Sequence, residues 1–379
     1  MRRWPTSTPG AALEIPAQHR IPLTWLLAHG EAPVRYRTLA ELAPAGRAAP
    51  DDVAAARQAV VESKAAETVV RKQLPNGTWG DSLAGMSFGK VQGREVGTVS
   101  QYRRLLQLGY PRDSRPVRLA ERMFFRVLSR DPDPALLFEA GKPLRKDAAA
   151  QEWARETLRE AAAGALAEGG HVEDPRLRGA GHRIATAISG FLRSPLADDP
   201  LVRTGRANVL HPDARPPSWY SVAMLGAMPN LRRERAGFTE RLGLYLAQPA
   251  PKKAFLVNVG DAQLPHGHLL LGDPIHADAR GNPKDIPLAL HYIELLAHLG
   301  ALQHAPVATK VLARLLHDCD DEGVWRPSGI KAAPKTDERL ICHYWPLQIE
   351  DRTAEGRLVD VTFRLAVIAR LLGLPLEYT

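Results

Sequence analysis

Cysteine, aromatic residues and long hydrophobic runs are all scarce in this chain, and each shortage excludes a class of protein. Two cysteines, Cys319 and Cys342, in 379 residues are too few for a disulfide-stabilised secreted domain and favour a reducing compartment. No run of about 18 apolar residues occurs, so we expect no membrane-spanning helix. The basic start, Met1-Arg2-Arg3, is not followed by the apolar segment of a signal peptide. The sequence therefore favours a cytoplasmic protein.

Charge of one sign is not concentrated anywhere in the chain. The formal net charge is +8, but the basic residues are spread beside Asp and Glu along helical segments and form no Lys/Arg block. Nucleic-acid-binding domains usually gather their basic residues into a patch or a stripe. We therefore expect no nucleic-acid partner and interpret the charge as that of a solvated surface.

Alternation of apolar and polar residues with a period of two is almost absent, whereas helical periodicity recurs. Apolar residues fall on one face over 98–108, and Gly109 ends that helix. We expect further helices over residues 51–72, 116–129, 146–167, 219–228, 285–299, 307–317 and 360–372. Three Gly- or Pro-rich segments, 80–97, 249–284 and 326–357, are expected to be loops. The sequence thus predicts an all-α fold with no sheet.

A motif that occurs twice is the most informative feature that is present. Leu74-Pro75-Asn76-Gly77-Thr78-Trp79 is matched by Asp320-Asp321-Glu322-Gly323-Val324-Trp325. Each copy puts a polar turn, a Gly and a Trp at the same offsets, between two helical segments. Repetition of this kind predicts helical repeats whose long loops gather on one face.

These Gly-x-Trp turns between helices resemble the repeats of the terpenoid cyclase and protein prenyltransferase superfamily. The opening Trp25-Leu26-Leu27 and Pro33-Val34-Arg35-Tyr36-Arg37-Thr38-Leu39 also look like those of bacterial squalene-cyclase-like proteins of unassigned function. The resemblance covers most of residues 21–379. It implies a single α/α toroid, a barrel of helical pairs, because the chain is about half the size expected of a two-toroid triterpene cyclase. Residues 1–20 are expected to form an irregular extension.

The resemblance also implies where a site would lie. In such a toroid the N-termini of the inner helices surround one cavity, which here would gather Thr98, Trp219, Asp285 and Asp360 with the three long loops over one mouth. Asp285 and Asp360 are expected to cap their helices, and a cap at a cavity rim can also contact a ligand. We take Asp285, Asp360 and His343 as candidate catalytic residues. The candidate binding residues are Arg94, Thr98, Trp219, Tyr220, His291, Tyr292, Tyr344 and Trp345.

Asp318-Cys319-Asp320-Asp321 has the D-x-D-D spacing of the acid motif of class II terpene cyclases. In that motif the middle Asp must be held protonated so that it can donate to an alkene. The alternative, which we favour, is that Asp320 and Asp321 belong to the Gly-Trp turn and accept hydrogen bonds from local backbone N–H groups. Aromatic residues are only 6% of the chain, whereas carbocation chemistry needs aromatic faces.

The densest group of metal-ligand residue types lies in the second long loop. His266, His268, Asp273 and His276 could hold a divalent metal, although their spacing matches no metal motif. The alternative is a polar loop in which these residues bond to backbone and water. A zinc site near Cys342, like that of protein prenyltransferases, is not expected because the spacing differs.

The sequence leaves three hypotheses for function. The first is a cyclase-like enzyme, a lyase, isomerase or transferase, that acts on a small molecule with polar groups but is not a standard triterpene cyclase. The second is a non-catalytic toroid that binds a ligand or a protein. The third is a carbohydrate-active enzyme on an α/α barrel, which would need two facing carboxylates about 5–9 Å apart. The sequence specifies no cofactor and no oligomeric state.

Overall fold

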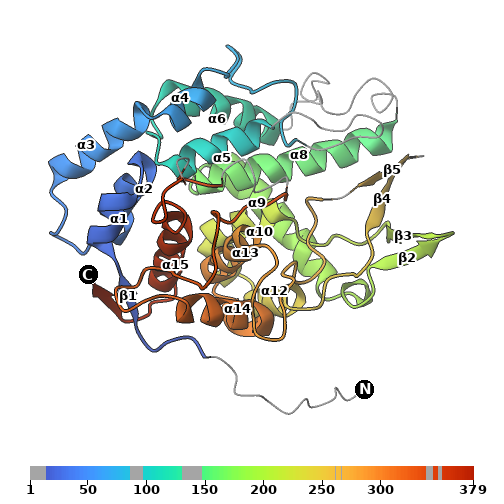
Figure 1. The fold of residues 1–379 in the computed structure, drawn as a ribbon. Coiled ribbons are helices and arrows are strands. Elements are labelled where there is room, and N and C mark those ends of the chain that lie inside the picture. Colours follow the sequence, from blue (N-terminus) through green and yellow to red (C-terminus); the bar gives the residue numbers. More distant parts are fainter. Residues whose placement is uncertain are drawn as a thin grey trace.

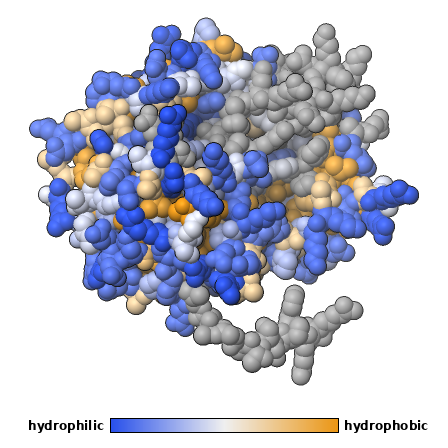
Figure 2. All heavy atoms as spheres, viewed as in Figure 1, coloured by the Kyte–Doolittle hydropathy of each residue, from blue (hydrophilic) through white to orange (hydrophobic). Residues whose placement is uncertain are grey.

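Helices form most of the molecule (Figure 1). The computed structural model describes residues 14–85, 97–129, 147–260, 262–265, 267–338, 345–348 and 352–379. Within this part of the chain, no helix combines the length and the apolar character that a membrane span requires. Hydrophilic side chains dominate the face in Figure 2, and the large exposed apolar residues are scattered: Leu74, Val202, Leu244, Val307 and Leu371.

Six helices contact one another in a closed order, and we call them the inner helices. Each packs against the next, and the last packs back against the first. In this order they are α2 (Ala32–Arg37), α5 (Thr98–Leu108), α8 (Ala148–Glu168), α10 (Trp219–Ala227), α13 (Ile286–Leu299) and α15 (Val359–Leu371). A π-helical turn, η1 (Thr38–Leu42), continues α2 and also packs on α15.

The inner helices α10 and α13 run in the same direction. Trp219 stacks on His291 with ring centroids 5.5 Å apart, and Gly226 lies against the Cβ atom of His298. The second contact is seven residues further along both helices. Their N-terminal ends therefore lie at the same end of the molecule.

Helices α5 and α15 are also parallel. Arg104 interacts electrostatically with Asp360, and further along both helices Gln107 Oε1 accepts a hydrogen bond of 2.8 Å from Arg364 Nη2. Both contacts advance towards the C-terminal ends together. Within each of the two pairs, the N-terminal ends therefore lie together.

The other helices pack against the inner ones. They are α1 (Leu23–His29), α3 (Pro50–Val61), α4 (Lys64–Val70), α6 (Arg115–Leu128), α9 (Pro175–Phe191), α11 (Pro229–Arg233), α12 (Phe238–Leu246) and α14 (Pro306–His317), with short 3₁₀ turns η3 (Pro195–Ala197) and η4 (Leu302–His304). The helix expected over 51–72 is broken into α3 and α4, because Ser63 begins a new helix by accepting a hydrogen bond from Ala66 N.

Two small sheets correct the expectation of an all-α fold. One holds β2 (Leu201–Thr204), β3 (Ala207–Leu210), β4 (Phe255–Val259) and β5 (Ala262–Pro265) in that order, at the right of Figure 1. The other pairs β1 (His19–Ile21) with β6 (Leu376–Tyr378) in parallel. Strands of three to five residues are too short to give a clear alternating pattern. Because β1 starts at His19, the irregular segment expected over 1–20 ends earlier than predicted.

The two Gly-x-Trp turns have matching hydrogen bonds, which confirms the repeat. Trp79 N donates to Thr98 Oγ1 on α5, and Trp325 N donates to Thr362 Oγ1 on α15, both at 3.1 Å. Each turn leads to the inner helix that follows it in the chain. The motif therefore joins an outer helix to an inner helix in both copies, α4 to α5 and α14 to α15.

The glycines of the two turns are also equivalent. Gly77 and Gly323 have φ angles of 92° and 91°, which favour glycine. A Cβ atom at Gly77 would meet the carbonyl oxygen of Leu119, and one at Gly323 would meet that of Arg20. Both positions need glycine for its conformation and for the close approach of a neighbouring backbone.

Candidate functional site

The N-terminal ends of α5 and α10 are joined by the loop that follows the first Gly-x-Trp turn. Thr98 Oγ1 donates to Ser82 O at 3.0 Å, and Tyr220 Oη donates to Ala84 O at 3.2 Å. Two predicted binding residues, Thr98 and Tyr220, thus lie near each other in the fold. Both side chains donate a hydrogen bond to a backbone carbonyl group of this loop.

The N-terminal ends of α13 and α15 are held by the third long loop. Asp285 Oδ2 accepts a hydrogen bond of 2.7 Å from Thr336 Oγ1, and Asp360 Oδ1 accepts one of 2.8 Å from Leu347 N. α10 is parallel to α13, α5 is parallel to α15, and the loop at Ser82 and Ala84 joins the starts of α5 and α10. These four N-terminal ends therefore lie on the same side of the molecule.

Asp285 and Asp360 differ in how they use their carboxylates. Asp285 is the predicted N-cap, since its Oδ1 accepts from Leu288 N at 2.8 Å. Asp360 is not a cap, which corrects the expectation, because α15 begins one residue earlier, at Val359. Its buried carboxylate instead accepts from the backbone N–H groups of Leu347 and Gln348, and burial raises its pKa to about 6.

Charged and polar side chains fill part of the space between the inner helices. We call them the inner polar cluster: Arg103, Arg104 and Gln107 of α5, Glu168 of α8, His291 and Glu294 of α13, and Asp360 and Arg364 of α15. Arg103 pairs with Glu168 at 2.6 Å and Arg364 pairs with Glu294 at 2.9 Å. Arg37 of α2 joins the cluster through Gln107 Oε1, which accepts from its Nη1 at 3.0 Å.

Arg104 is the member of the cluster that holds the third loop. Its Nη1 donates to Pro346 O at 2.5 Å, next to the residues that Asp360 binds. Burial lowers the pKa of Arg104 to about 10, although Asp360 acts in the opposite direction. Residues 345–348 are thereby fixed from both α5 and α15.

Glu160 of α8 is a candidate that sequence reasoning missed. Burial raises its pKa to about 7, although Ser218 and Ser221 at the start of α10 act in the opposite direction. A carboxyl group with such a pKa can give or take a proton near neutral pH. Nothing in the Ala-rich sequence around Glu160 distinguishes it from the solvated acidic residues of the same helix.

Of the predicted aromatic and histidine residues, His291, Trp219 and Trp345 lie in or beside the inner polar cluster, whereas Tyr292 lies towards α12. His291 stacks on Trp219, and burial lowers its pKa to about 3, so its imidazole is neutral. The guanidinium carbon of Arg364 lies over the Trp345 ring, 5.8 Å from the centroid of that ring. Tyr292 donates from Oη to Leu246 O at 2.8 Å and is buried towards α12.

The predicted metal residues do not come together among the described residues. His268 is buried against Trp153, and Asp273 Oδ1 accepts from Ile275 N at 2.8 Å, while burial raises the pKa of Asp273 to about 6. His276 is exposed. No three His, Cys, Asp or Glu side chains of the described segments are placed to hold a metal ion.

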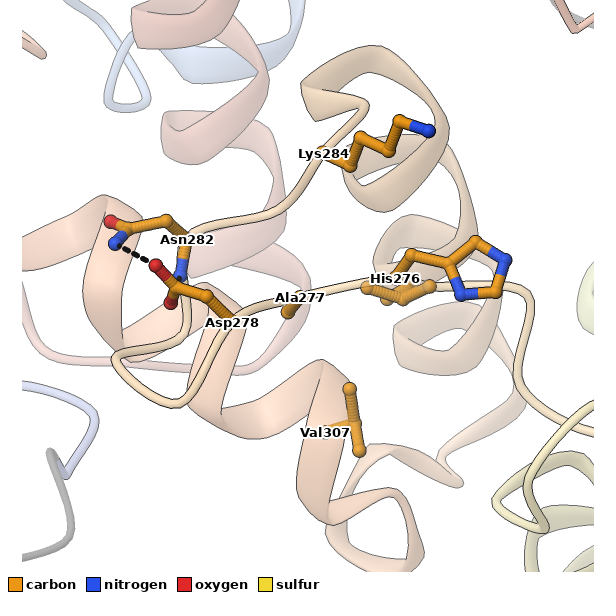
Figure 3. Close-up of a pocket in the computed structure, with 7 residues that line it drawn as sticks. His276, Ala277, Asp278, Asn282, Lys284 and Val307 are labelled. Carbon is orange, nitrogen blue, oxygen red and sulfur yellow. Dashed lines mark hydrogen bonds between the residues drawn. The ribbon is translucent and has the colours of Figure 1, made fainter.

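An open surface depression of about 590 Å³ lies beside His276 (Figure 3). Its lining is Ile275, His276, Ala277, Asp278, Asn282, Lys284 and Val307. The Asp278 carboxylate accepts from Asn282 Nδ2 and from two backbone N–H groups, so it stabilises its own turn. None of these residues belongs to the inner polar cluster.

The D-x-D-D segment has the turn structure that we favoured. Asp320 Oδ1 accepts from the backbone N–H groups of Glu322 and Val324, and its Oδ2 pairs with Arg326 at 2.7 Å. Asp318 pairs with Arg314. The Asp320 carboxylate therefore holds the second Gly-x-Trp turn.

Five of the residues considered for a site in the sequence analysis lie outside the described residues: Arg94, His266, Cys342, His343 and Tyr344. Their proposed roles stay predictions. Comparison with models of known protein families, with curated proteins and with solved structures finds no match to this chain. The function is therefore argued from the geometry alone.

Proposed function

We propose that the chain is a single α/α toroid of the terpenoid cyclase and protein prenyltransferase kind, and that it is an enzyme for a small polar molecule. The closed order of the inner helices, their common direction and the two equivalent Gly-x-Trp turns support the toroid. The molecule binds at the end where the N-termini of α5, α10, α13 and α15 lie.

The inner polar cluster is the observation from which we infer that the ligand is polar. Charged groups lose hydration when they are buried, and ion pairs only partly offset that loss. A hydrocarbon ligand beside such groups would add to the desolvation without giving them partners. The two ion pairs and the buried Asp360 therefore favour a ligand that forms hydrogen bonds.

Glu160 is the residue to which we assign proton transfer. Its pKa of about 7 suits a general acid or base, and the serines that act on this pKa, Ser218 and Ser221, lie at the start of α10. Asp360 and Arg104 are positioning residues, because both hold residues 345–348 at the same end of the inner helices.

The test is to incubate the purified protein with a metabolite extract and to profile the extract by mass spectrometry. We expect the wild-type protein to deplete a polar compound and form a product from it, and Glu160→Gln to lose at least about a hundredfold of that rate. Glu240→Gln, a change of an exposed glutamate on α12, is the control and should keep the rate. Full activity in Glu160→Gln, or turnover confined to isoprenoid lipids, would contradict the proposal.

A non-catalytic binding role is the second candidate. It is favoured by the hydrogen bonds that occupy the carboxylates of Asp285 and Asp360, since neither is left to act as a catalytic pair. In the same experiment this role would give a polar compound that stays bound to the protein and is recovered unchanged.

A further inference from the structure

Four arginines are buried among the described residues, with 4% to 8% of each exposed. Three of them have a carboxylate partner, at 2.6, 2.6 and 2.9 Å respectively: Arg37 with Glu41, Arg103 with Glu168, and Arg364 with Glu294. Arg104, the fourth, forms no ion pair within the described part of the chain. A buried guanidinium without a carboxylate partner is uncommon, because its desolvation is then poorly offset.

Arg104 has hydrogen-bonding capacity to spare. A guanidinium carries five N–H donors, and within the described residues Arg104 uses Nη1 alone, towards Pro346 O. Some buried polar atoms, such as Nε of Arg364, are sealed from solvent and have no partner. Nε and Nη2 of Arg104 are not in that group. Within the described residues, these N–H groups therefore have no hydrogen-bond acceptor.

The neighbouring acids do not satisfy Arg104. Asp360 interacts with it electrostatically, but the two carboxylate oxygens of Asp360 accept from Leu347 N and Gln348 N. Glu31 also acts only at longer range, and Arg364 repels the guanidinium. The position still favours one more negative group in contact with Arg104.

We propose that Arg104 binds a carboxylate of the ligand. A planar carboxylate matches the fork of a guanidinium, which can donate two parallel hydrogen bonds to it. A phosphate would bring more negative charge close to Asp360 and Glu31, and their repulsion disfavours it. This inference rests on the proposed function, because it names the class of small molecule that the same end of the inner helices takes.

The experiment is equilibrium dialysis against a defined mixture of small carboxylates, the matching neutral amides and phosphate monoesters, read by mass spectrometry. We expect the wild-type protein to retain carboxylates above their amides, and Arg104→Gln to reduce that retention by at least about tenfold. Arg112→Gln is the matched control, because Arg112 is exposed and also donates from Nη1 to a backbone carbonyl, that of Gly169 at 3.1 Å.

A second variant separates binding from folding. Arg104→Lys keeps the charge but loses the paired donors, so we expect carboxylate retention between that of wild type and Arg104→Gln, with an unchanged circular dichroism spectrum. Retention of amides or phosphate esters in place of carboxylates overturns this inference and leaves the proposed function standing. Equal retention by wild type and both Arg104 variants also overturns it. Retention of no compound at all contradicts the proposed function itself.

Discussion

At the scale of single residues, the molecule keeps carboxyl groups where burial opposes their ionisation. Glu160 illustrates this, because its pKa in the folded protein is raised from 4.5 to about 7. The ionised form therefore opposes folding, and this destabilisation grows as pH rises from about 4.5 to about 7 and is complete above it. A buried carboxyl group that destabilises the folded state in this way is a candidate for a functional role.

The first prediction concerns the stability of Glu160→Gln. The amide cannot ionise, so we expect this variant to be more stable than wild type by about 1–3 kcal/mol at pH 8.5, with a smaller difference at pH 5. Urea unfolding at the two pH values measures it. Glu240→Gln, on the exposed face of α12, should show no such pH-dependent gain. A Glu160→Gln difference that is the same at both pH values would contradict the raised pKa.

At the scale of elements, the Gly-x-Trp turns are the part of the fold that could be predicted most completely from the sequence. The motif, its repetition and its place before an inner helix were all predictable, because glycine and turn residues act locally. The helix over 98–108 was likewise predicted with its C-terminal Gly109, which has a φ of 82°.

The elements that were missed depend on contacts between distant segments. β1 is formed by pairing with β6 more than 350 positions later, which no local pattern reveals. The cluster residues Arg103, Arg104 and Gln107 share a face of α5 that looks like an ordinary solvated face in the sequence. It is buried because α5 is surrounded by other helices, and that is known only from the fold.

The second prediction tests the equivalence of the two turns. Gly77→Ala and Gly323→Ala each combine an unfavourable positive φ with a clash against a backbone carbonyl, so each should destabilise the protein by at least about 2 kcal/mol. Gly46→Ala is the control, because Gly46 has a φ of 81° but open space around a Cβ atom. Its destabilisation should be nearer 1 kcal/mol. Urea unfolding that ranks Gly46→Ala level with the other two would contradict the close packing.

The third prediction concerns the hydroxyl groups that anchor the turns. Thr98→Val and Thr362→Val remove the acceptors of Trp79 N and Trp325 N without changing side-chain shape. Each should cost about 1–3 kcal/mol, because a buried N–H loses its partner. Thermal unfolding should show similar shifts for the two variants, whereas a large loss in one and none in the other would mean that the two copies are not equivalent.

At the scale of the whole molecule, the two ends of the described chain pair with each other and close the order of the inner helices. β1 pairs with β6, and Thr379 N donates to Ile21 O at 3.1 Å. Nearby, α15 contacts both α1 and α2. The first and last inner helices are thus held together by segments from opposite ends of the sequence.

The fourth prediction is that this closure stabilises the whole molecule. Truncation after Pro375 removes β6 and should lower the free energy of unfolding by about 2–4 kcal/mol through the lost backbone hydrogen bonds and packing. Faster hydrogen exchange in α15 should accompany it. Glu377→Ala, which removes only an exposed ion pair with Arg20, is the control and should change little. Unchanged exchange in α15 after truncation would show that the strands do not hold the closure.

A crystal structure of the purified protein, soaked with the compound that it retains from a metabolite mixture, tests the central claim most directly. We expect the compound at the N-terminal end of α5, α10, α13 and α15, with polar contacts to Arg104 or Glu160. A compound bound instead in the surface depression beside His276, or inner helices whose N-termini point to opposite ends, would contradict the account.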